Sequence, residues 1–175
     1  MIRIVKSLAM VLCVLTGGCT GIPKGIEAVE SFSLERYLGR WYEIARLDHS
    51  FERGLSRVTA EYSLGEAGRV TVVNRGYRAN TGEWKSVTGT ARFAGSDRRG
   101  HLLVSFFPPF AASYVIIELD RQDYRYALVC GPNRDYLWIL SREPALDSAI
   151  RNRLVARAEE LGFPVDELLF IEHGE

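Results

Sequence analysis

Hydrophobic and polar residues alternate along much of the chain between residues 40 and 141. In the segment 56–64, one face carries Val58, Ala60, Tyr62 and Leu64, and the other carries Arg57, Thr59, Glu61 and Ser63. Because successive side chains of a strand point to opposite faces, this pattern is typical of a strand with one buried face. We expect strands at 40–47, 56–64, 69–77, 84–94, 101–107, 113–120, 124–130 and 135–141.

Turn-forming residues separate these segments. They include Gly65 and Gly68, Asn80 and Gly82, Gly95 and Gly100, Pro108 and Pro109, and the stretch from Gly131 to Asn133. Glycine, proline and asparagine favour the backbone conformations of tight turns. Eight short strands joined in sequence by such turns predict an antiparallel sandwich or an up-and-down barrel.

The period of the pattern changes after Pro144. Hydrophobic residues then recur at the spacing of a helix that buries one face, and Gly162 supplies a C-terminal stop. The repeating residues are Leu146, Ile150, Leu154, Ala158 and Leu161. A final short strand is expected at 168–172. The pattern therefore predicts an all-β fold with one C-terminal α-helix.

The N-terminus has a different character. Residues 1–18 begin with Arg3 and Lys6, continue through a short apolar core and end in small residues directly before Cys19. This layout predicts a secretory signal peptide, and its apolar core is too short for a membrane span. We therefore divide the chain into a signal peptide (1–18), a tether (19–32) and a folded domain (33–175).

The junction at Cys19 resembles the lipobox of bacterial lipoproteins, whose cysteine is acylated after the signal peptide is cut. It departs from that pattern in one place, because Thr16 stands where the family prefers leucine. The resemblance implies lipidation of Cys19 and, since Thr20 rather than aspartate follows, an outer-membrane location facing the periplasm. Several acyl chains would give lasting attachment. The alternative is an ordinary signal peptide with a cysteine near its end.

Charge and cysteine content refine this picture. The chain has 22 basic and 22 acidic residues, a balance that argues against nucleic acid as a partner. Loss of the signal peptide removes Arg3 and Lys6 and leaves a formal charge of −2, so membrane attachment is expected from acyl chains and not from a basic surface. Cys13 leaves with the signal and Cys19 is expected to be lipidated, so Cys130 has no disulfide partner and is expected to be buried.

The sequence offers little material for catalysis. His49, His101 and His173 are predicted to lie too far apart for a metal site, and no serine has a nucleophile-elbow context. No glycine-rich phosphate loop is present. His49 beside Asp48 is the one arguable acid–base pair, and a loop contact explains it more simply. We expect no catalytic residue, no metal and no cofactor.

Three motifs point to a family. Gly39 and Trp41 open the first strand, Asp120 ends the sixth, and Arg142 follows the eighth. Together they resemble the motifs of lipocalins, and the stretches 37–55 and 127–142 are similar to the outer-membrane lipoprotein branch, which is related to apolipoprotein D. The resemblance implies an eight-stranded antiparallel up-and-down β-barrel. Its connectivity would gather Trp41, Asp120 and Arg142 at a closed end, where their role is structural.

The expected barrel interior is an apolar cup with room for one ligand. Its inward set would be Ala45, Val58, Ala60, Val72, Val87, Gly89, Ala91, Val104, Leu128 and Leu140. The resemblance to apolipoprotein D-like lipocalins implies that Tyr62, Asn74, Arg78 and Trp138 line the pocket, and strand parity adds Tyr136 and Glu43. Arg78 would bind a phosphate or carboxylate, or else remain a solvated charge at the rim. The direction of Tyr114 stays open, because the same parity would turn Glu118 inward.

The resemblance implies binding of a small amphipathic lipid, a fatty acid or a lysophospholipid, for storage or transport in maintenance of the cell envelope under stress. It also implies a homodimer. Two alternatives stay open. One is an enzyme of the same fold acting on a lipophilic substrate. The other is an interaction protein that uses the loops expected at the open end, at 48–55, 78–83, 107–112 and 131–134, above all Phe107 to Phe110.

Overall fold

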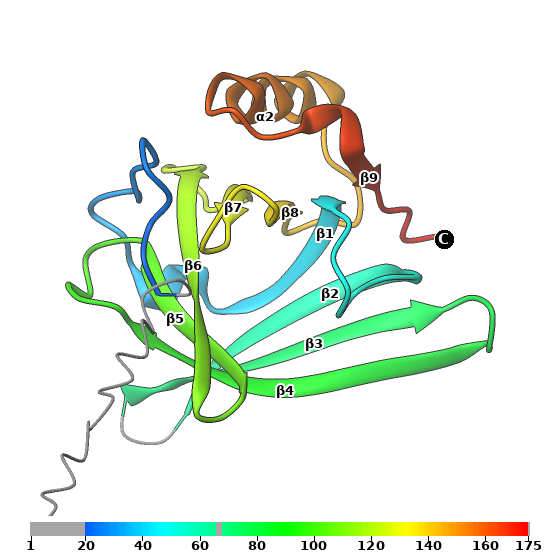
Figure 1. The fold of residues 1–175 in the computed structure, drawn as a ribbon, viewed down its shortest axis with the longest axis horizontal. Coiled ribbons are helices and arrows are strands. Elements are labelled where there is room, and N and C mark those ends of the chain that lie inside the picture. Colours follow the sequence, from blue (N-terminus) through cyan, green and yellow to red (C-terminus); the bar gives the residue numbers. More distant parts are fainter. Residues whose placement is uncertain (1–19, 66–67, 175) are drawn as a thin grey trace, which may run out of the picture.

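The computed structural model describes residues 20–65 and 68–174, so the predicted signal peptide and Cys19 lie outside the described residues. Eight strands form the barrel of Figure 1: β1 (Gly39–Leu47), β2 (Leu55–Leu64), β3 (Val70–Arg78), β4 (Glu83–Phe93), β5 (His101–Phe107), β6 (Phe110–Leu119), β7 (Tyr126–Cys130) and β8 (Leu137–Ser141). The other elements are α1 (Leu34–Tyr37), α2 (Ser148–Glu160), the 3-10 helix η2 (Val165–Glu167) and β9 (Leu168–Phe170).

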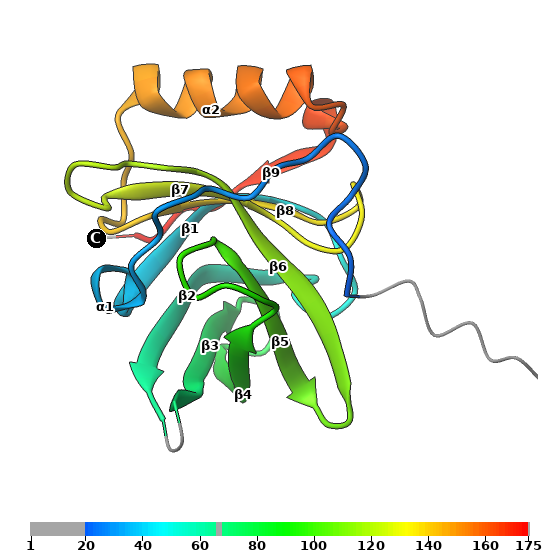
Figure 2. The same ribbon diagram turned by 90° about the vertical axis from the view of Figure 1, so that its left-hand side faces the viewer.

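The sheet is closed by its first strand. Each strand pairs antiparallel with the next, and β1 pairs with β8 along one edge and with β2 along the other. This closure confirms the eight-stranded up-and-down barrel and excludes the sandwich. Helix α2 lies across the outside of the barrel and β9 adds beside β1 (Figure 2). In the described part of the chain, no helix has the length and apolar character needed to cross a bilayer.

Some strand limits differ from the prediction. The turn between β5 and β6 holds only Pro108 and Pro109, because Phe107 already pairs with Phe110. Strand β7 begins at Tyr126 and not at Tyr124, whose positive φ of 56° belongs to the preceding turn. Strand β8 begins after Tyr136, and the final strand ends at Phe170.

Two apolar layers hold the fold together. One fills the barrel, and the other lies between the barrel wall and α2, where Leu154 and Ala158 are fully buried. Ala45 and Leu128 belong to this outer layer, so their prediction as inward residues was wrong. For Ala45 the reason is a bulge between Glu43 and Ala45, which reverses the direction of the side chains that follow it in β1. For Leu128 the reason is that β7 is buried on both faces, so the alternation of apolar residues does not show which side of β7 faces the barrel interior.

Cys130 also lies in the outer layer. It is a free, buried thiol, and burial raises its pKa to about 12. A thiol that stays protonated at physiological pH is a poor nucleophile. Cys130 therefore acts as a small apolar residue, as the sequence predicted.

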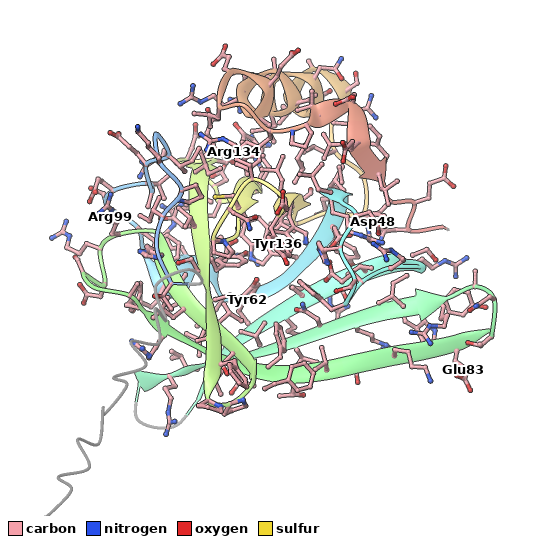
Figure 3. All side chains as sticks on the ribbon, viewed as in Figure 1. Asp48, Tyr62, Glu83, Arg99, Arg134 and Tyr136 are labelled. Atoms are coloured by element: carbon pink, nitrogen blue, oxygen red, sulfur yellow. The ribbon has the colours of Figure 1, made fainter. Side chains whose placement is uncertain are left out.

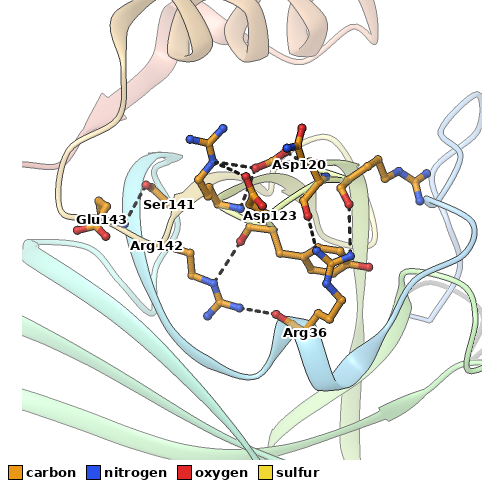
Figure 4. Close-up of polar contacts among 10 residues, drawn as sticks. Arg36, Asp120, Asp123, Ser141, Arg142 and Glu143 are labelled. Carbon is orange, nitrogen blue, oxygen red and sulfur yellow. Dashed lines mark hydrogen bonds and ion pairs between the residues drawn. The ribbon is translucent and has the colours of Figure 1, made fainter.

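The closed end is built around Trp41, which has no exposed surface. Its indole N–H donates to the carbonyl of Tyr37 at 2.8 Å, and the guanidinium carbon of Arg142 lies 4.0 Å from its ring centre. Arg142 also donates to the carbonyl oxygens of Arg36 and Tyr124, as drawn in Figure 4. It donates to the carbonyl oxygen of Arg40 as well. One side chain thus joins α1, β1 and the β6–β7 turn over the barrel floor.

The first prediction concerns this floor. Arg142→Met should lower the free energy of unfolding by about 3 kcal/mol, because three charge-assisted hydrogen bonds and one cation–π contact are lost. Urea unfolding measures the change. Arg92→Met is the matched control, since Arg92 is exposed on β4 and makes only a 3.5 Å bond to the carbonyl of Phe93. Equal losses in the two variants would contradict the structural role of Arg142.

The second prediction concerns Asp120, which accepts bonds from the backbone N–H groups of Gln122 and Arg125 and from the Arg125 side chain. Burial opposes its ionisation, but these bonds outweigh burial and hold its pKa below the usual value. The ionised form therefore stabilises the fold fully above about pH 4, and this contribution is lost as pH falls through the lower folded-state pKa.

Accordingly, the loss of stability in Asp120→Asn should be constant above about pH 5 and should shrink below about pH 4, as followed by urea unfolding at each pH. Asp123→Asn is the control in the same turn, because Asp123 is exposed and lies 3.7 Å from the Arg125 guanidinium. A stability difference for Asp120→Asn that does not change with pH would refute the assignment.

Candidate functional site

The lower interior of the barrel contains a chain of tyrosine hydroxyls. Tyr62 donates to Tyr114 at 2.9 Å, and the hydroxyls of Tyr114 and Tyr37 lie 2.8 Å apart. Tyr114 points inward while Glu118 faces α2, because a bulge between Ile116 and Glu118 resolves the parity conflict in the sequence. Burial raises the pKa of all three tyrosines, so their hydroxyls stay neutral. They satisfy one another within an otherwise apolar wall.

The wall formed by β2, β3 and β4 carries the next polar group toward the mouth. Asn74 lies in register with Ala60 and Val87, and its Oδ1 is buried without a hydrogen-bond partner among the described residues. Arg78 ends β3 and is half-buried. Gly89 leaves no open space, because a side chain there would meet the ring of Phe106 at 2.6 Å. The small residues of this wall therefore partly accommodate other side chains.

The upper interior holds a buried ionic cluster that the sequence did not reveal. Arg46 is 2% exposed and donates to the Glu43 carboxylate at 2.5 Å and to the carbonyl oxygens of Glu52 and Leu55 at 3.0 Å. The bulge in β1 places Arg46, and not Ala45, on the inner face beside Trp138. An arginine within the otherwise apolar run from Ile44 to Leu47 was the one available signal.

The β1–β2 loop (residues 48–54) is fastened to this cluster from above. Glu52 accepts a bond from the Trp138 indole N–H at 3.1 Å and lies 2.9 Å from His49 Nε2. The His49 ring stacks on Phe51 and lies near Tyr136. Tyr136 is labelled in Figure 3. Two predicted pocket residues, Tyr136 and Trp138, therefore also hold the loop in place.

The two carboxylates of the cluster respond differently to burial. Burial raises the pKa of Glu43 well above its usual value, and the nearby charge of Glu52 adds to this effect against the opposing Arg46. Burial acts on Glu52 as well, but bonds from His49 and Trp138 outweigh it and lower its pKa. Glu52 is therefore the fixed negative charge of the cluster.

The structure brings most of the predicted pocket residues to one interior. Tyr62 belongs to the apolar core inside the barrel, Asn74 lies on β3 in register with Ala60 and Val87, and Arg78 ends β3. Glu43 and Trp138 belong to the ionic cluster, and Tyr136 lies beside the loop that covers it. Glu43 is engaged by Arg46 and Trp138 by Glu52, whereas Asn74 Oδ1 has no partner among residues 20–65 and 68–174. The interior is therefore apolar apart from the tyrosine hydroxyls toward the closed end, and polar and ionic toward the open end.

Comparisons with known proteins place this geometry in a family. The model of the lipocalin-like domain matches residues 32–173. This chain is a lipocalin. The outer membrane lipoprotein Blc of Vibrio cholerae is 48% identical over 95% of this chain and 98% of its own length. Blc of Escherichia coli is 49% identical over 86% of this chain and 84% of its own, and rat apolipoprotein D is 38% identical over 67% of this chain and 64% of its own.

Solved structures agree on the fold of this lipocalin. Insecticyanin from the tobacco hornworm Manduca sexta superposes with a TM-score of 0.71 over 91% of both chains at 18% identity. The cockroach allergen Per a 4 superposes with a TM-score of 0.67 at 20% identity and covers 86% of this chain and 94% of its own. The matching family model and the Blc relatives confirm the family resemblance inferred from Gly39, Trp41, Asp120 and Arg142.

The three histidines of this lipocalin lie apart from one another and have different partners. His49 pairs with Glu52 within the β1–β2 loop, which agrees with the loop contact favoured from the sequence, and the neighbouring Asp48 binds Arg53 on the surface. His101 contacts Ser113, and His173 donates to the carbonyl of Glu43. Within residues 20–65 and 68–174, no three His, Cys, Asp or Glu side chains gather closely enough to hold a metal ion.

The third prediction compares two carboxylates of the same loop. Glu52→Ala should cost about 3 kcal/mol of unfolding free energy, because it leaves the Trp138 indole N–H without its buried acceptor and removes the carboxylate that pairs with His49. Asp48→Ala should cost less than about 1 kcal/mol, since its bond to Arg53 is exposed. Urea unfolding followed by tryptophan fluorescence measures both. Similar costs for the two variants would show that the cluster does not hold the loop.

Proposed function

We propose that this lipocalin binds one single-chain amphipathic lipid, a fatty acid or a lysophospholipid, inside its barrel. Cys19 carries acyl chains that anchor the protein to the periplasmic side of the outer membrane. The lipid is buried and released reversibly, with no bond made or broken. The protein thereby stores or transports lipids during maintenance of the cell envelope, including under stress.

The observation that carries the proposal is the buried Oδ1 of Asn74, which has no partner among the described residues. A buried polar atom without a hydrogen bond costs about 1–3 kcal/mol, so a position that retains one is suited to a ligand group. Asn74 lies between the tyrosines below and Arg78 above on the same strand, β3. The amide can bond a glycerol hydroxyl or carboxyl group, and Arg78 can pair with its phosphate or carboxylate.

The proposed location rests on the N-terminal sequence and on the relatives. The stretch from Thr16 to Cys19 resembles a lipobox. Two relatives that are 48% and 49% identical bear the name outer membrane lipoprotein. Cys19 lies outside the described residues, so its acylation is tested by the intact mass of protein extracted from host membranes.

The fourth prediction tests the pocket. Asn74→Leu should weaken lysophospholipid binding about tenfold and also stabilise the protein, because it removes a buried acceptor that lacks a partner among the described residues. Arg78→Ala should weaken binding by at least about tenfold, since a charge-assisted hydrogen bond is lost. Displacement of a fluorescent fatty acid measures affinity, and Arg92→Ala is the control on the outer face of β4.

Native mass spectrometry of protein purified from its host, followed by lipid extraction, identifies the bound molecule. Protein that is always empty and binds neither lysophospholipid nor fatty acid would refute the proposal. Turnover of the lipid, abolished by Glu43→Gln or His49→Ala, would instead support the enzyme alternative. The same spectra report whether two copies associate, as the family resemblance implies.

A further inference from the structure

The turn between β5 and β6 exposes two large aromatic side chains. Phe107 and Phe110 are 72% and 77% exposed and face each other in register across Pro108 and Pro109. No charged residue occurs between Leu102 and Ile117. An exposed apolar feature of this kind at a loop tip marks a contact surface.

The backbone of this turn is also suited to a medium of low polarity. Pro108 and Pro109 have no backbone N–H, so the turn lacks the two donors that other residues would present there. The Ser105 hydroxyl donates to the carbonyl of Phe110 at 2.5 Å and satisfies one of the remaining polar groups. Fewer backbone groups would therefore have to lose water when the tip leaves it.

The tether begins at the same end of the barrel. Up-and-down connectivity places the β1–β2, β3–β4, β5–β6 and β7–β8 turns together at the open end. The carbonyl of Lys24 accepts a bond of 2.9 Å from Arg134, which lies in the β7–β8 turn. Lys24 lies five positions after Cys19, so at most about 18 Å of chain joins the anchor to the body.

We infer that the open end of the barrel faces the bilayer to which Cys19 is anchored, and that Phe107 and Phe110 enter the boundary between headgroups and acyl chains. Phe51, which is 56% exposed on the β1–β2 loop at the same end, is the third side chain of this contact. The partner that these side chains contact is a phospholipid bilayer. The inference rests on the anchoring part of the proposed function, because only the short tether holds this end near the membrane. A lipid could then pass between bilayer and barrel without crossing bulk water.

The test uses full-length protein that the host has processed, reconstituted into vesicles of phosphatidylethanolamine and phosphatidylglycerol. Phe110→Cys places an accessible thiol at the tip, since Cys130 is buried and the Cys19 thiol is consumed by acylation. Phe170→Cys is the matched control, because Phe170 is a 54% exposed aromatic residue on β9 at the flank. Leu64→Cys, at 63% exposure, reports on the closed end. Each variant carries an environment-sensitive fluorophore, and the vesicles contain a spin label near the acyl–glycerol boundary.

A blue shift and spin-label quenching at position 110, absent at 64 and 170, would support the inference. Emission at 110 typical of water, or quenching at 170 in place of 110, would overturn it. A blue shift at 110 without lipid quenching would also overturn it, because a second copy of the chain would then cover the tip. An unmodified Cys19 would refute anchoring and inference together, whereas an acylated Cys19 with a solvated tip would refute the inference alone.

Discussion

The fold depends on the pairing of β1 along both of its edges. Strand β8 and strand β2 meet on β1, and without this contact the sheet would be open, with two unpaired edges. The same strand supplies the plug of the closed end through Trp41 and the charges of the open end through Glu43 and Arg46. Strand β1 also packs against α2 with an apolar outer face. It can do so because the bulge between Glu43 and Ala45 turns Ala45 toward α2.

That bulge also explains where sequence reasoning succeeded and where it failed. The strands with one solvated face, such as β2 and β3, were predicted within a few residues, because alternation and turn residues are local properties. Five consecutive residues of β1, from Glu43 to Leu47, are all buried, so periodicity could not show which of them face the interior. The assignment of Ala45 as inward and the omission of Arg46 follow from this single irregularity.

Contacts between distant segments were beyond the reach of the sequence for a second reason. Trp138 meets Glu52 across 86 positions, and Tyr62 meets Tyr114 across 52. Such pairs depend on strand register, which shifts at the bulge in β6 between Ile116 and Glu118. The family resemblance supplied Tyr62, Asn74, Arg78 and Trp138 as a set, but the structure shows that Trp138 is bonded to Glu52 and that Asn74 Oδ1 has no such bond within the described chain.

The order of polar groups along the barrel fixes how an amphipathic molecule can sit inside it. The tyrosine hydroxyls at the bottom satisfy one another and present no unpaired group to a ligand. Above them, Asn74 Oδ1, Arg46 Nε and His49 Nδ1 are buried without partners in the described part of the chain. A headgroup buried at the closed end would leave these three atoms without hydrogen bonds. Its own polar groups would also find no free partner there, because the tyrosine hydroxyls already bond one another. The acyl chain is therefore expected at the closed end and the headgroup at the mouth, where Arg78 lies.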